Sequence, residues 1–277
     1  MGKRLLDIVV AGLALTASSP LLLFAAIGIR LTSPGPIFYR ARRIARDRRD
    51  VPYAPRHVLW SPEQRRDGGY HGREFTMYKF RTMRVDTAGA PLSITAANDP
   101  RVFRFGAFLR ATKIDELPQL INVLKGDMTI VGPRPEAPDI VRGHYTPDDL
   151  TTLKVPPGVT SPGTIYYYTH GESKLAVDGV VDQYVQELLP AKLALDRVYI
   201  KRPTVLYDIR VMLRTIVTIV AKSLGRQGFP DPPELAEADV NRRGGVPVAA
   251  KRLDPDPRPL LPGEPAGRPA DAVPDRS

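Results

Sequence analysis

The sequence predicts an α+β protein that is mostly helical. A re-entrant membrane helix at the N-terminus is expected to precede a compact cytosolic domain with a small β-hairpin and interfacial amphipathic helices. Three observations predict this fold: an apolar run over residues 8–29, strand-like patterns at residues 37–40 and 74–83, and helical periodicity over residues 117–124 and 204–220.

Composition divides the chain into three parts. Residues 1–36 hold the apolar run and the Ser-Pro-Gly-Pro turn after it, so we expect a membrane anchor there. Residues 37–225 contain the strand and helix patterns of one domain, in which residues 46–72 are rich in Arg, Asp, Pro and Gly and resemble an inserted loop. Residues 226–277 lack periodicity and predict a disordered, Pro-rich tail.

The charge balance narrows the class of partner. The 277 residues include 40 Lys and Arg against 30 Asp and Glu, a formal net charge of +10 that favours nucleic acid, anionic lipid or phosphorylated substrates. The sequence has no RNP, helix-turn-helix or zinc signature, so we do not expect nucleic acid. It has no cysteine, which excludes a disulfide framework and a thiolate metal site.

The apolar run admits three interpretations. At about 22 residues it is long enough to span a bilayer as a straight helix. A secretory signal peptide is the second interpretation, but Asp7 interrupts the positive start and apolar sequence continues past the small residues near Ala17. The third is a re-entrant helix that enters and leaves the membrane on one side.

A Ser-Pro pair in mid-run favours the re-entrant helix. Pro20 removes one backbone hydrogen bond and kinks a helix, while the hydroxyls of Ser18 and Ser19 can satisfy the freed carbonyls. Basic residues flank the run on both sides, and the positive-inside rule places both flanks in the cytoplasm. A bend at Ser19-Pro20 satisfies that rule, and a straight spanning helix does not.

The most informative stretch of the chain is residues 109–135. Leu117, Leu120, Ile121 and Leu124 form an apolar stripe at helical spacing, and Gly126 ends the helix. Asp115 and Glu116 precede this stripe, at the helix end that favours anions. One interpretation is a pair of capping residues in the first turn. The other is a site for a phosphate or a divalent metal.

The residues that follow favour the second interpretation. Pro133 and Pro135 fix the backbone on both sides of Arg134, whose guanidinium suits bidentate contact with phosphate. Asp127 adds a carboxylate within the same stretch, or is a turn residue. Carboxylates that can hold a metal beside a phosphate-binding arginine suggest phosphoryl chemistry on a substrate bound to Mg²⁺.

These residues carry a resemblance to a known family. The motif DELPQL-x-NVLKGDM, followed by VGPRP, resembles bacterial sugar transferases of the small, monotopic polyprenyl-phosphate phosphoglycosyl transferase type. Members of that family start glycoconjugate assembly at the membrane and carry a Ser-Pro break in a re-entrant helix. The resemblance implies that residues 37–225 form a catalytic sugar transferase domain.

The resemblance also implies a reaction. The Asp of the motif, here Asp115, attacks the β-phosphate of a UDP-sugar, UMP leaves, and polyprenyl phosphate takes the phosphosugar from the aspartate. Glu116 is implied as a partner, so Asp115 and Glu116 are the expected Mg²⁺ ligands. Two alternatives stay open, a direct membrane glycosyltransferase that releases UDP and a membrane-anchored binding protein without enzyme activity.

Three further cations complete the expected site. Lys79 and Arg81 belong to a run that resembles the family's YKFRxM motif, although they also fit a strand with a solvated cationic face. Arg110 lies five residues before Asp115, as in the family, or is a surface cation. The expected substrate-binding set is Lys79, Arg81, Arg110, Asp127, Pro133, Arg134 and Pro135.

The remaining segments are less specific. Residues 155–160, VPPGVT, resemble a Pro-Gly-Ile-Thr turn of the family, but SPGTIYYY follows where the family has Gly-Trp-x-Gln, which leaves the sugar undetermined. Residues 204–220 predict a basic amphipathic helix that packs on the core or lies in the membrane interface. The resemblance implies the cytoplasmic face of the bacterial inner membrane, with both termini cytoplasmic, and leaves a homodimer open.

Overall fold

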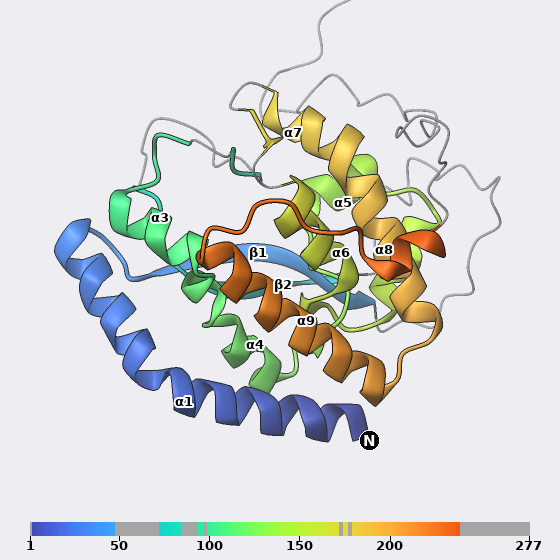
Figure 1. Cartoon of the computed structure of the whole chain (residues 1–277), viewed down its shortest axis with the longest axis horizontal. Helices are drawn as coiled ribbons and strands as arrows, with labels where there is room; N and C mark the ends of the chain where they lie inside the picture. Colours follow the sequence, from blue (N-terminus) through green and yellow to red (C-terminus); the bar gives the residue numbers. More distant parts are fainter. Residues whose placement is uncertain are drawn as a thin grey trace, which may run out of the picture.

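The computed structural model describes residues 2–47, 72–84, 94–96, 99–171, 174–176 and 179–238 (Figure 1). Within these residues the fold is mostly helical, as predicted. The α-helices are α1 (Gly2–Thr32), α3 (Arg104–Ala111), α4 (Gln119–Lys125), α5 (Pro138–His144), α6 (Pro162–Tyr166), α7 (Val180–Gln183), α8 (Leu189–Lys201) and α9 (Val205–Ser223). Shorter 3₁₀ and π turns are η1 (Ile114–Glu116), η2 (Asp149–Lys154), η3 (Tyr167–Gly171), η5 (Tyr184–Leu188) and η6 (Pro233–Ala236).

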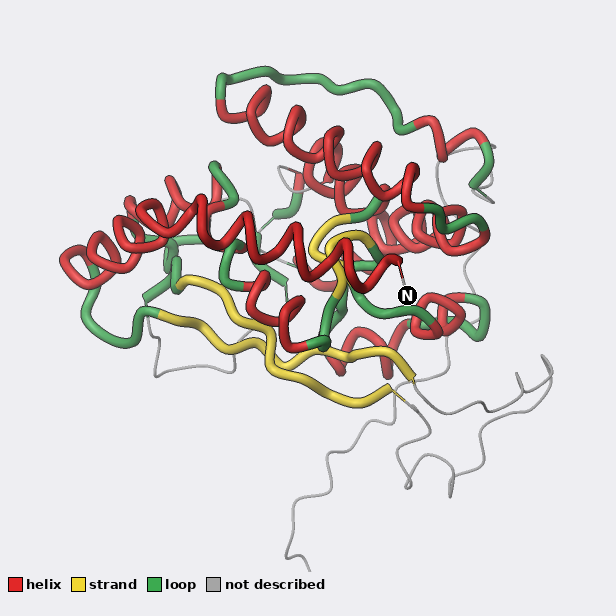
Figure 2. The backbone as a smooth tube through the Cα atoms, turned by 90° about the horizontal axis from the view of Figure 1, so that it is seen from below, coloured by secondary structure: helices red, strands yellow, loops and turns green. Residues whose placement is uncertain are grey.

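The predicted β-hairpin is present and longer than expected. β1 (Phe38–Asp47) pairs antiparallel with β2 (Gly72–Phe80), and Tyr39 lies opposite Lys79. Figure 2 shows these two strands side by side along one side of the helical body. Phe75 and Met77 are buried, as the alternation of the strand predicted. Most of the expected loop at residues 46–72 lies outside the described residues.

Two short parallel strands form a second pairing. β3 (Thr129–Val131) lies beside β4 (Gly158–Thr160), with Val131 opposite Thr160. A Cβ on Gly158 would lie 2.2 Å from the backbone nitrogen of Gly132, so only glycine allows the chains to come this close. The pairing fixes the backbone just before the Pro-Arg-Pro segment.

Helix α1 bends in its middle, as Figure 1 shows. Pro20 lies inside the helix and cannot donate to the carbonyl of Thr16, four residues earlier. The hydroxyl of Ser19 donates to that same carbonyl at 2.8 Å. The predicted role of Ser19 in satisfying a carbonyl freed by Pro20 is therefore confirmed.

Both ends of α1 are attached to the same domain. At the start, Lys3 forms an ion pair with Asp208 at 2.5 Å, and buried Asp7 accepts hydrogen bonds from the hydroxyl of Thr129 and the amide of Ile130. At the end, the guanidinium of Arg81 donates to Ser33 and to the carbonyl of Pro36. The helix is 31 residues long and apolar enough to cross a membrane by length and composition.

The predicted apolar stripe of α4 is only partly buried. Leu120 is buried, but Ile121 and Leu124 are 38% and 40% exposed, and the buried face instead contains the amides of Gln119 and Asn122. Asn122 accepts a hydrogen bond from the amide of Tyr78 and donates to the carbonyl of Thr76, which attaches α4 to the edge of β2. Periodicity could not predict this, because Asn is a polar residue whose burial depends on those two partners.

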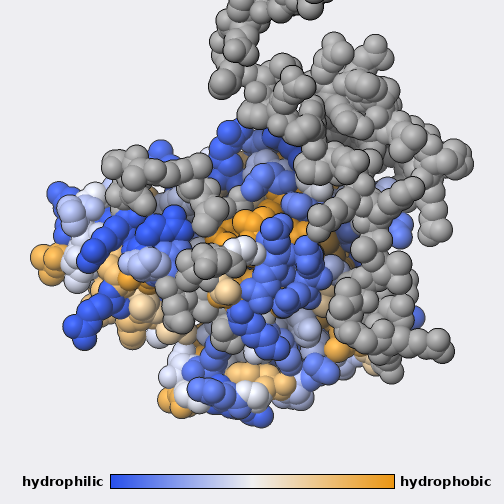
Figure 3. Space-filling model, turned by 90° about the horizontal axis from the view of Figure 1, so that it is seen from above, coloured by the Kyte–Doolittle hydropathy of each residue, from blue (hydrophilic) through white to orange (hydrophobic). Residues whose placement is uncertain are grey.

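Helix α9 keeps its apolar stripe at the surface. The side chains of Leu206, Leu213 and Ile216 are 58–59% exposed, so the interpretation of a stripe packed on the domain core is wrong for the described residues. Figure 3 shows the molecule from above, where an apolar patch lies next to hydrophilic residues.

The segment that follows α9 is folded, where the sequence predicted disorder. Residues 226–238 turn back along α9, and Glu234 is buried against it. Arg214 donates two hydrogen bonds of 3.0 Å to the carboxylate of Glu234, and the hydroxyl of Tyr207 donates a third. The prediction of a disordered tail from residue 226 is therefore wrong for residues 226–238. The rest of the expected tail lies outside the described residues.

Candidate active site

The two adjacent carboxylates lie in a sharp turn between α3 and α4. Lys113 begins this turn in the left-handed region, with φ of 56°, and the 3₁₀ turn η1 follows at once. No side chain caps η1 or α4, so the interpretation of Asp115 and Glu116 as capping residues is wrong. The turn instead directs both carboxylates into the interior, where Asp115 is 7% exposed.

Glu116 is neutralised by two cations. The ammonium of Lys79 donates to Oε1 of Glu116 at 2.9 Å, and Arg134 binds both oxygens at 2.6 and 3.1 Å. Burial alone would raise the pKa of Glu116, but Arg134 and Lys79 hold it well below its usual value. Burial lowers the pKa of Lys79, and Glu116 opposes that shift. Glu116 therefore stays ionised and holds both cations in place.

Asp115 has the opposite environment. Its Oδ1 atom is buried and has no hydrogen-bond partner among the described residues. Burial, together with the charge of Glu116, raises the pKa of Asp115 to about 6, against the opposing charges of Lys79, Lys113 and Arg110. A carboxylate that is desolvated but still ionised near neutral pH is a better nucleophile than one held by hydrogen bonds.

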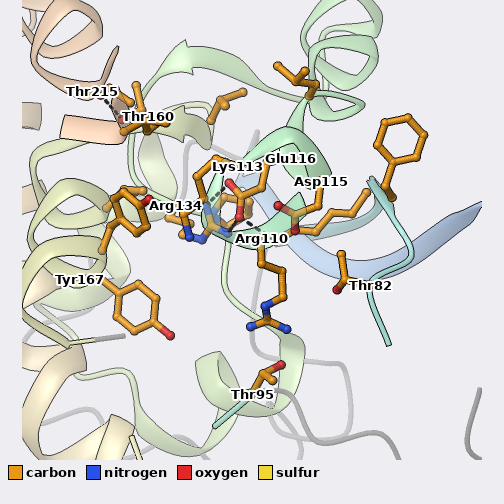
Figure 4. A pocket seen from close by; sticks show the side chains of 18 of the residues that line it. Thr82, Thr95, Arg110, Lys113, Asp115, Glu116, Arg134, Thr160, Tyr167 and Thr215 are labelled. Carbon is orange, nitrogen blue, oxygen red and sulfur yellow. Dashed lines mark hydrogen bonds and ion pairs between the residues drawn. The ribbon is translucent and has the colours of Figure 1, made fainter. Parts of the chain in front are cut away.

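Both carboxylates line a cavity of about 620 Å³. Its wall has a strong excess of positive charge, because only three acids of the described part of the chain, Asp115, Glu116 and Glu136, line it. The cations of the wall are Arg43, Lys79, Arg81, Arg84, Arg101, Arg110, Lys113, Arg134 and Lys192. In Figure 4 the side chains of Arg110 and Tyr167 extend into the space beside the carboxylates, toward Thr95. A cavity of this size and charge suits a small polyanion.

The parallel strand pair positions Arg134. Just after β3, the amide of Gly132 donates to the carbonyl of Thr160 at 2.9 Å, and the carbonyl of Pro133 accepts from the amide of Gly158 at 2.8 Å. Pro133 and Pro135 are buried, and Pro135 lines the cavity. The two prolines therefore fix the backbone beside Arg134, and these three residues lie together with Asp115, Glu116, Lys79 and Arg110.

Two members of the expected set have other partners. Arg81 lies at the edge of the cavity, but its guanidinium donates to the carbonyl of Ser33 at 2.7 Å as well as to the Ser33 hydroxyl and Pro36. Asp127 does not line the cavity and lies 3.5 Å from Arg73. The structure brings neither side chain to the two carboxylates.

A second polar group in the cavity wall was missed by sequence reasoning. The carboxylate of Glu136 accepts hydrogen bonds from Tyr184 at 2.7 Å and from buried Lys192. Burial would raise the pKa of Glu136, but Lys192 lowers it below its usual value. Glu136 could have been found, since it follows Pro135 directly. Lys192 gave no signal, because it lies far along the chain in an unremarkable helix.

The residues present fit a magnesium ion that is held mainly by its substrate. Among the described residues, no three His, Asp or Glu side chains gather where they could share a metal. Mg²⁺ is commonly bound by one or two carboxylates together with substrate phosphates. The unpartnered oxygen of Asp115 fits that arrangement, whereas both oxygens of Glu116 already accept hydrogen bonds from cations.

Comparison with known proteins places this site in a family. The family described as bacterial sugar transferase matches residues 1–54 and 56–222. The matched residues include the bent helix, the carboxylates Asp115 and Glu116, and the cations around them. The chain belongs to the bacterial sugar transferase family. The resemblance drawn from the DELPQL and PRP motifs is thereby confirmed.

Named relatives act on undecaprenyl phosphate. The chain is 33% identical to a UDP-glucose:undecaprenyl-phosphate glucose-1-phosphate transferase of Xanthomonas campestris, over 80% of this chain and 39% of that protein. It is also 33% identical to a Caulobacter vibrioides protein of the same name, over 79% of this chain and 69% of that protein. A relative from Aeromonas hydrophila, 31% identical over 79% of this chain and 43% of its own length, is named for N-acetylgalactosamine. The chain thus spans well under half of the Xanthomonas protein, and the named sugars differ.

Proposed function

We propose that the protein transfers a sugar 1-phosphate from a UDP-sugar to undecaprenyl phosphate, through a covalent phosphosugar on Asp115, with release of UMP. The observation that carries this proposal is the difference in environment between the neighbouring carboxylates Asp115 and Glu116. Glu116 is neutralised by Lys79 and Arg134, whereas Asp115 keeps a buried, unpartnered oxygen in a cationic cavity. The names of the relatives supply the substrate class.

The first step is attack by Asp115 on the donor. A carboxylate oxygen forms a bond to the β-phosphorus, and the bond from that phosphorus to the bridging oxygen breaks. The electron pair leaves with the bridging oxygen on UMP, so no proton has to move. Arg134, Lys79 and Arg110 can neutralise the diphosphate, because charge on the transferred phosphoryl oxygens is the main obstacle to such attack.

The second step regenerates the enzyme. An oxygen of the lipid phosphate forms a bond to the same phosphorus, the bond to Asp115 breaks, and the carboxylate returns. Mg²⁺, when bound at Asp115 and the donor diphosphate, would supply further neutralisation of charge. The covalent step lets a soluble donor and a lipid acceptor use one site in turn.

We further propose that α1 is re-entrant and that the domain lies on the cytoplasmic face. A straight α-helix of 31 residues would carry its ends about 46 Å apart, on opposite sides of a bilayer. Here Asp7 at one end and Ser33 at the other are both hydrogen-bonded to the same domain. Both ends of α1 therefore belong on one side. The homodimer that the sequence left open is not part of this proposal.

Helix α9 fits the membrane interface beside this anchor. Its exposed apolar stripe includes Leu213, Ile216 and Val220, while Arg210 lies on the exposed surface of the same helix. An amphipathic helix of this kind binds at the boundary between headgroups and acyl chains. The active site would then open close to the lipid phosphates.

The test is nucleotide release from detergent-solubilised protein supplied with Mg²⁺, undecaprenyl phosphate and a panel of UDP-sugars. We expect one or more sugars to yield UMP, and Asp115→Asn to abolish it. Asp182→Asn, at an exposed position of α7, is the matched control and should retain activity. Release of UDP would overturn the proposal in favour of direct glycosyl transfer, and activity that survives Asp115→Asn would exclude the covalent step.

A further inference from the structure

A second, smaller cavity lies next to the active site. It has a volume of about 230 Å³ and lies between α1, just after its Pro20 bend, and α9. Its lining is aliphatic apart from Thr112 and Lys113. The apolar residues of this cavity, called here the α1–α9 groove, are Leu21, Ile114, Leu117, Ile216, Ile219 and Val220.

The groove opens on the apolar surface of the molecule. Leu21, Ile216 and Val220 form its rim, with 38%, 59% and 52% of each side chain exposed. They belong to α1, the helix that is apolar enough for a membrane, and to the exposed stripe of α9. A ligand in the groove can therefore extend from the protein into an apolar phase without crossing water.

The groove adjoins the active-site cavity. Lys113, Leu117, Ile216 and Ile219 line both spaces. Among the described residues, Lys113 is the one cation that lines the groove, and its ammonium lies 4.1 Å from the ring centre of Tyr168. Because Lys113 also lines the active-site cavity beside Asp115, a phosphate bound to it would lie next to the nucleophile.

We propose that the α1–α9 groove binds the first isoprene units of the acceptor lipid, and that Lys113 binds its phosphate. This inference rests on the proposed function and adds a separate entrance for the second substrate. The donor would occupy the large cationic cavity, and the lipid phosphate would approach Asp115 from the other side of Lys113. The aliphatic lining suits isoprene units, and within the described residues its polar side chains are those of Thr112 and Lys113, too few to bind a nucleotide.

The proposal predicts that a change in the groove impairs use of the acceptor more than use of the donor. Lys113→Gln should raise the KM for undecaprenyl phosphate about tenfold or more, the equivalent of about 1.4 kcal/mol, and should raise the KM for the UDP-sugar by a smaller factor. Lys222→Gln is the matched control, because the Lys222 ammonium lies 3.8 Å from the same Tyr168 ring but lines neither cavity. A larger effect of Lys113→Gln on the KM for the UDP-sugar than on the KM for the lipid, or equal effects of the Lys113→Gln and Lys222→Gln variants on the lipid, would overturn the proposal.

Filling the groove gives an independent test. Val220→Trp should raise the KM for undecaprenyl phosphate, whereas Val217→Trp, on the exposed side of α9 but outside the groove, should not. Equal kinetics for these two variants would contradict the proposal.

Binding measurements separate the sources of phosphate and do not depend on turnover. In nanodiscs, undecaprenyl phosphate should compete with a photoreactive polyprenyl phosphate for labelling near Val220, while undecaprenol should compete weakly and inorganic phosphate not at all. Competition by inorganic phosphate equal to that by the lipid would overturn the proposal that the groove binds the lipid. If this labelling is specific but no UDP-sugar yields UMP, the proposed function fails, whereas lipid binding in the groove is supported.

Discussion

Asp115 and Glu116 are neighbours in sequence with opposite electrostatic environments. The longer side chain of Glu116 reaches Lys79 and Arg134, whereas Asp115 keeps an oxygen without a partner. The motif identified both residues, and the proline pair identified Arg134. Which of the two carboxylates the cations neutralise could not be predicted, because Lys79 comes from a strand 37 residues earlier in the chain. Such a pairing depends on tertiary structure.

The raised pKa of Asp115 predicts the pH dependence of the first step. The carboxylate must be ionised to attack, so UMP release with donor alone should be constant above about pH 6. Below that value it should fall about tenfold for each pH unit. Single-turnover measurements without lipid test this directly, because a lipid phosphate would add its own titration near pH 6. A rate that is unchanged down to pH 4.5 would show that the pKa of Asp115 is not raised.

The same pKa predicts a gain of stability in a variant. The folded protein binds the Asp115 proton more tightly than the unfolded chain does, since the pKa rises from 3.8 to about 6. Folding stability from this group is therefore present at low pH and lost as pH rises through about 6. Asp115→Asn should unfold at a higher urea concentration than the wild type at pH 7.5.

That advantage should shrink toward pH 4, where the wild-type carboxyl is protonated as well. Asp182→Asn, at an exposed position of α7, is the control, and its stability should match that of the wild type at both pH values. A variant that is less stable than the wild type at pH 7.5 would contradict the expected cost of burying the Asp115 charge.

At the scale of elements, the spacing of apolar residues predicted where helices form better than it predicted whether their apolar faces are buried. The period found α4 and α9, but Ile121, Leu124 and most of the α9 stripe lie at the surface rather than in the core. An apolar face that meets a membrane and one that meets a protein core have the same sequence signature. The bend of α1 was predictable, because its cause is local: Pro20 lacks the backbone donor, and the neighbouring Ser19 supplies a hydroxyl within the same helical turn.

The bend predicts a topological consequence for Pro20→Leu. A proline in a helix interior costs about 3 kcal/mol, so leucine should favour a straighter α1 that no longer holds both ends on one domain. The chain has no cysteine, so a single Gly2→Cys label reports the side of the membrane on which the N-terminus lies. We expect cytoplasmic labelling in the wild-type background and labelling from the opposite side to increase with Pro20→Leu.

Ser19→Ala is the control for this experiment. It removes the hydrogen bond to Thr16 but leaves the proline kink, so its labelling should remain cytoplasmic. Labelling of the Pro20→Leu protein that matches the Ser19→Ala protein would show that contacts with the domain, rather than the proline, set the direction of the helix.

At the scale of the whole molecule, residues 226–238 act as a strap along α9. Composition predicted disorder there, because the segment is rich in proline and lacks periodicity. Its buried carboxylate, Glu234, accepts hydrogen bonds from Arg214 and Tyr207, which both belong to α9. Contacts of this kind leave no pattern in a sequence.

Glu234→Gln should therefore destabilise the protein. The change leaves the partly buried Arg214 guanidinium, which is 28% exposed, without its counter-charge, and the loss of a partner by such a group costs about 1–3 kcal/mol. Glu237→Gln is the matched control, because Glu237 is 61% exposed and lies 3.9 Å from Arg202. Thermal unfolding in detergent should separate the two variants clearly, and equal unfolding temperatures would show that the strap contributes nothing to stability.

The polar start of α1 has a consequence for how the membrane segment can be exchanged. Asp7 satisfies an amide and a hydroxyl of β3, and Lys3 neutralises buried Asp208. The segment therefore cannot be exchanged as an independent anchor. With a foreign transmembrane helix, or in a truncated, water-soluble chain, these buried groups of the domain would lose their partners. A soluble form of the enzyme would have to retain the first turns of α1 and trim only the outward aliphatic side chains.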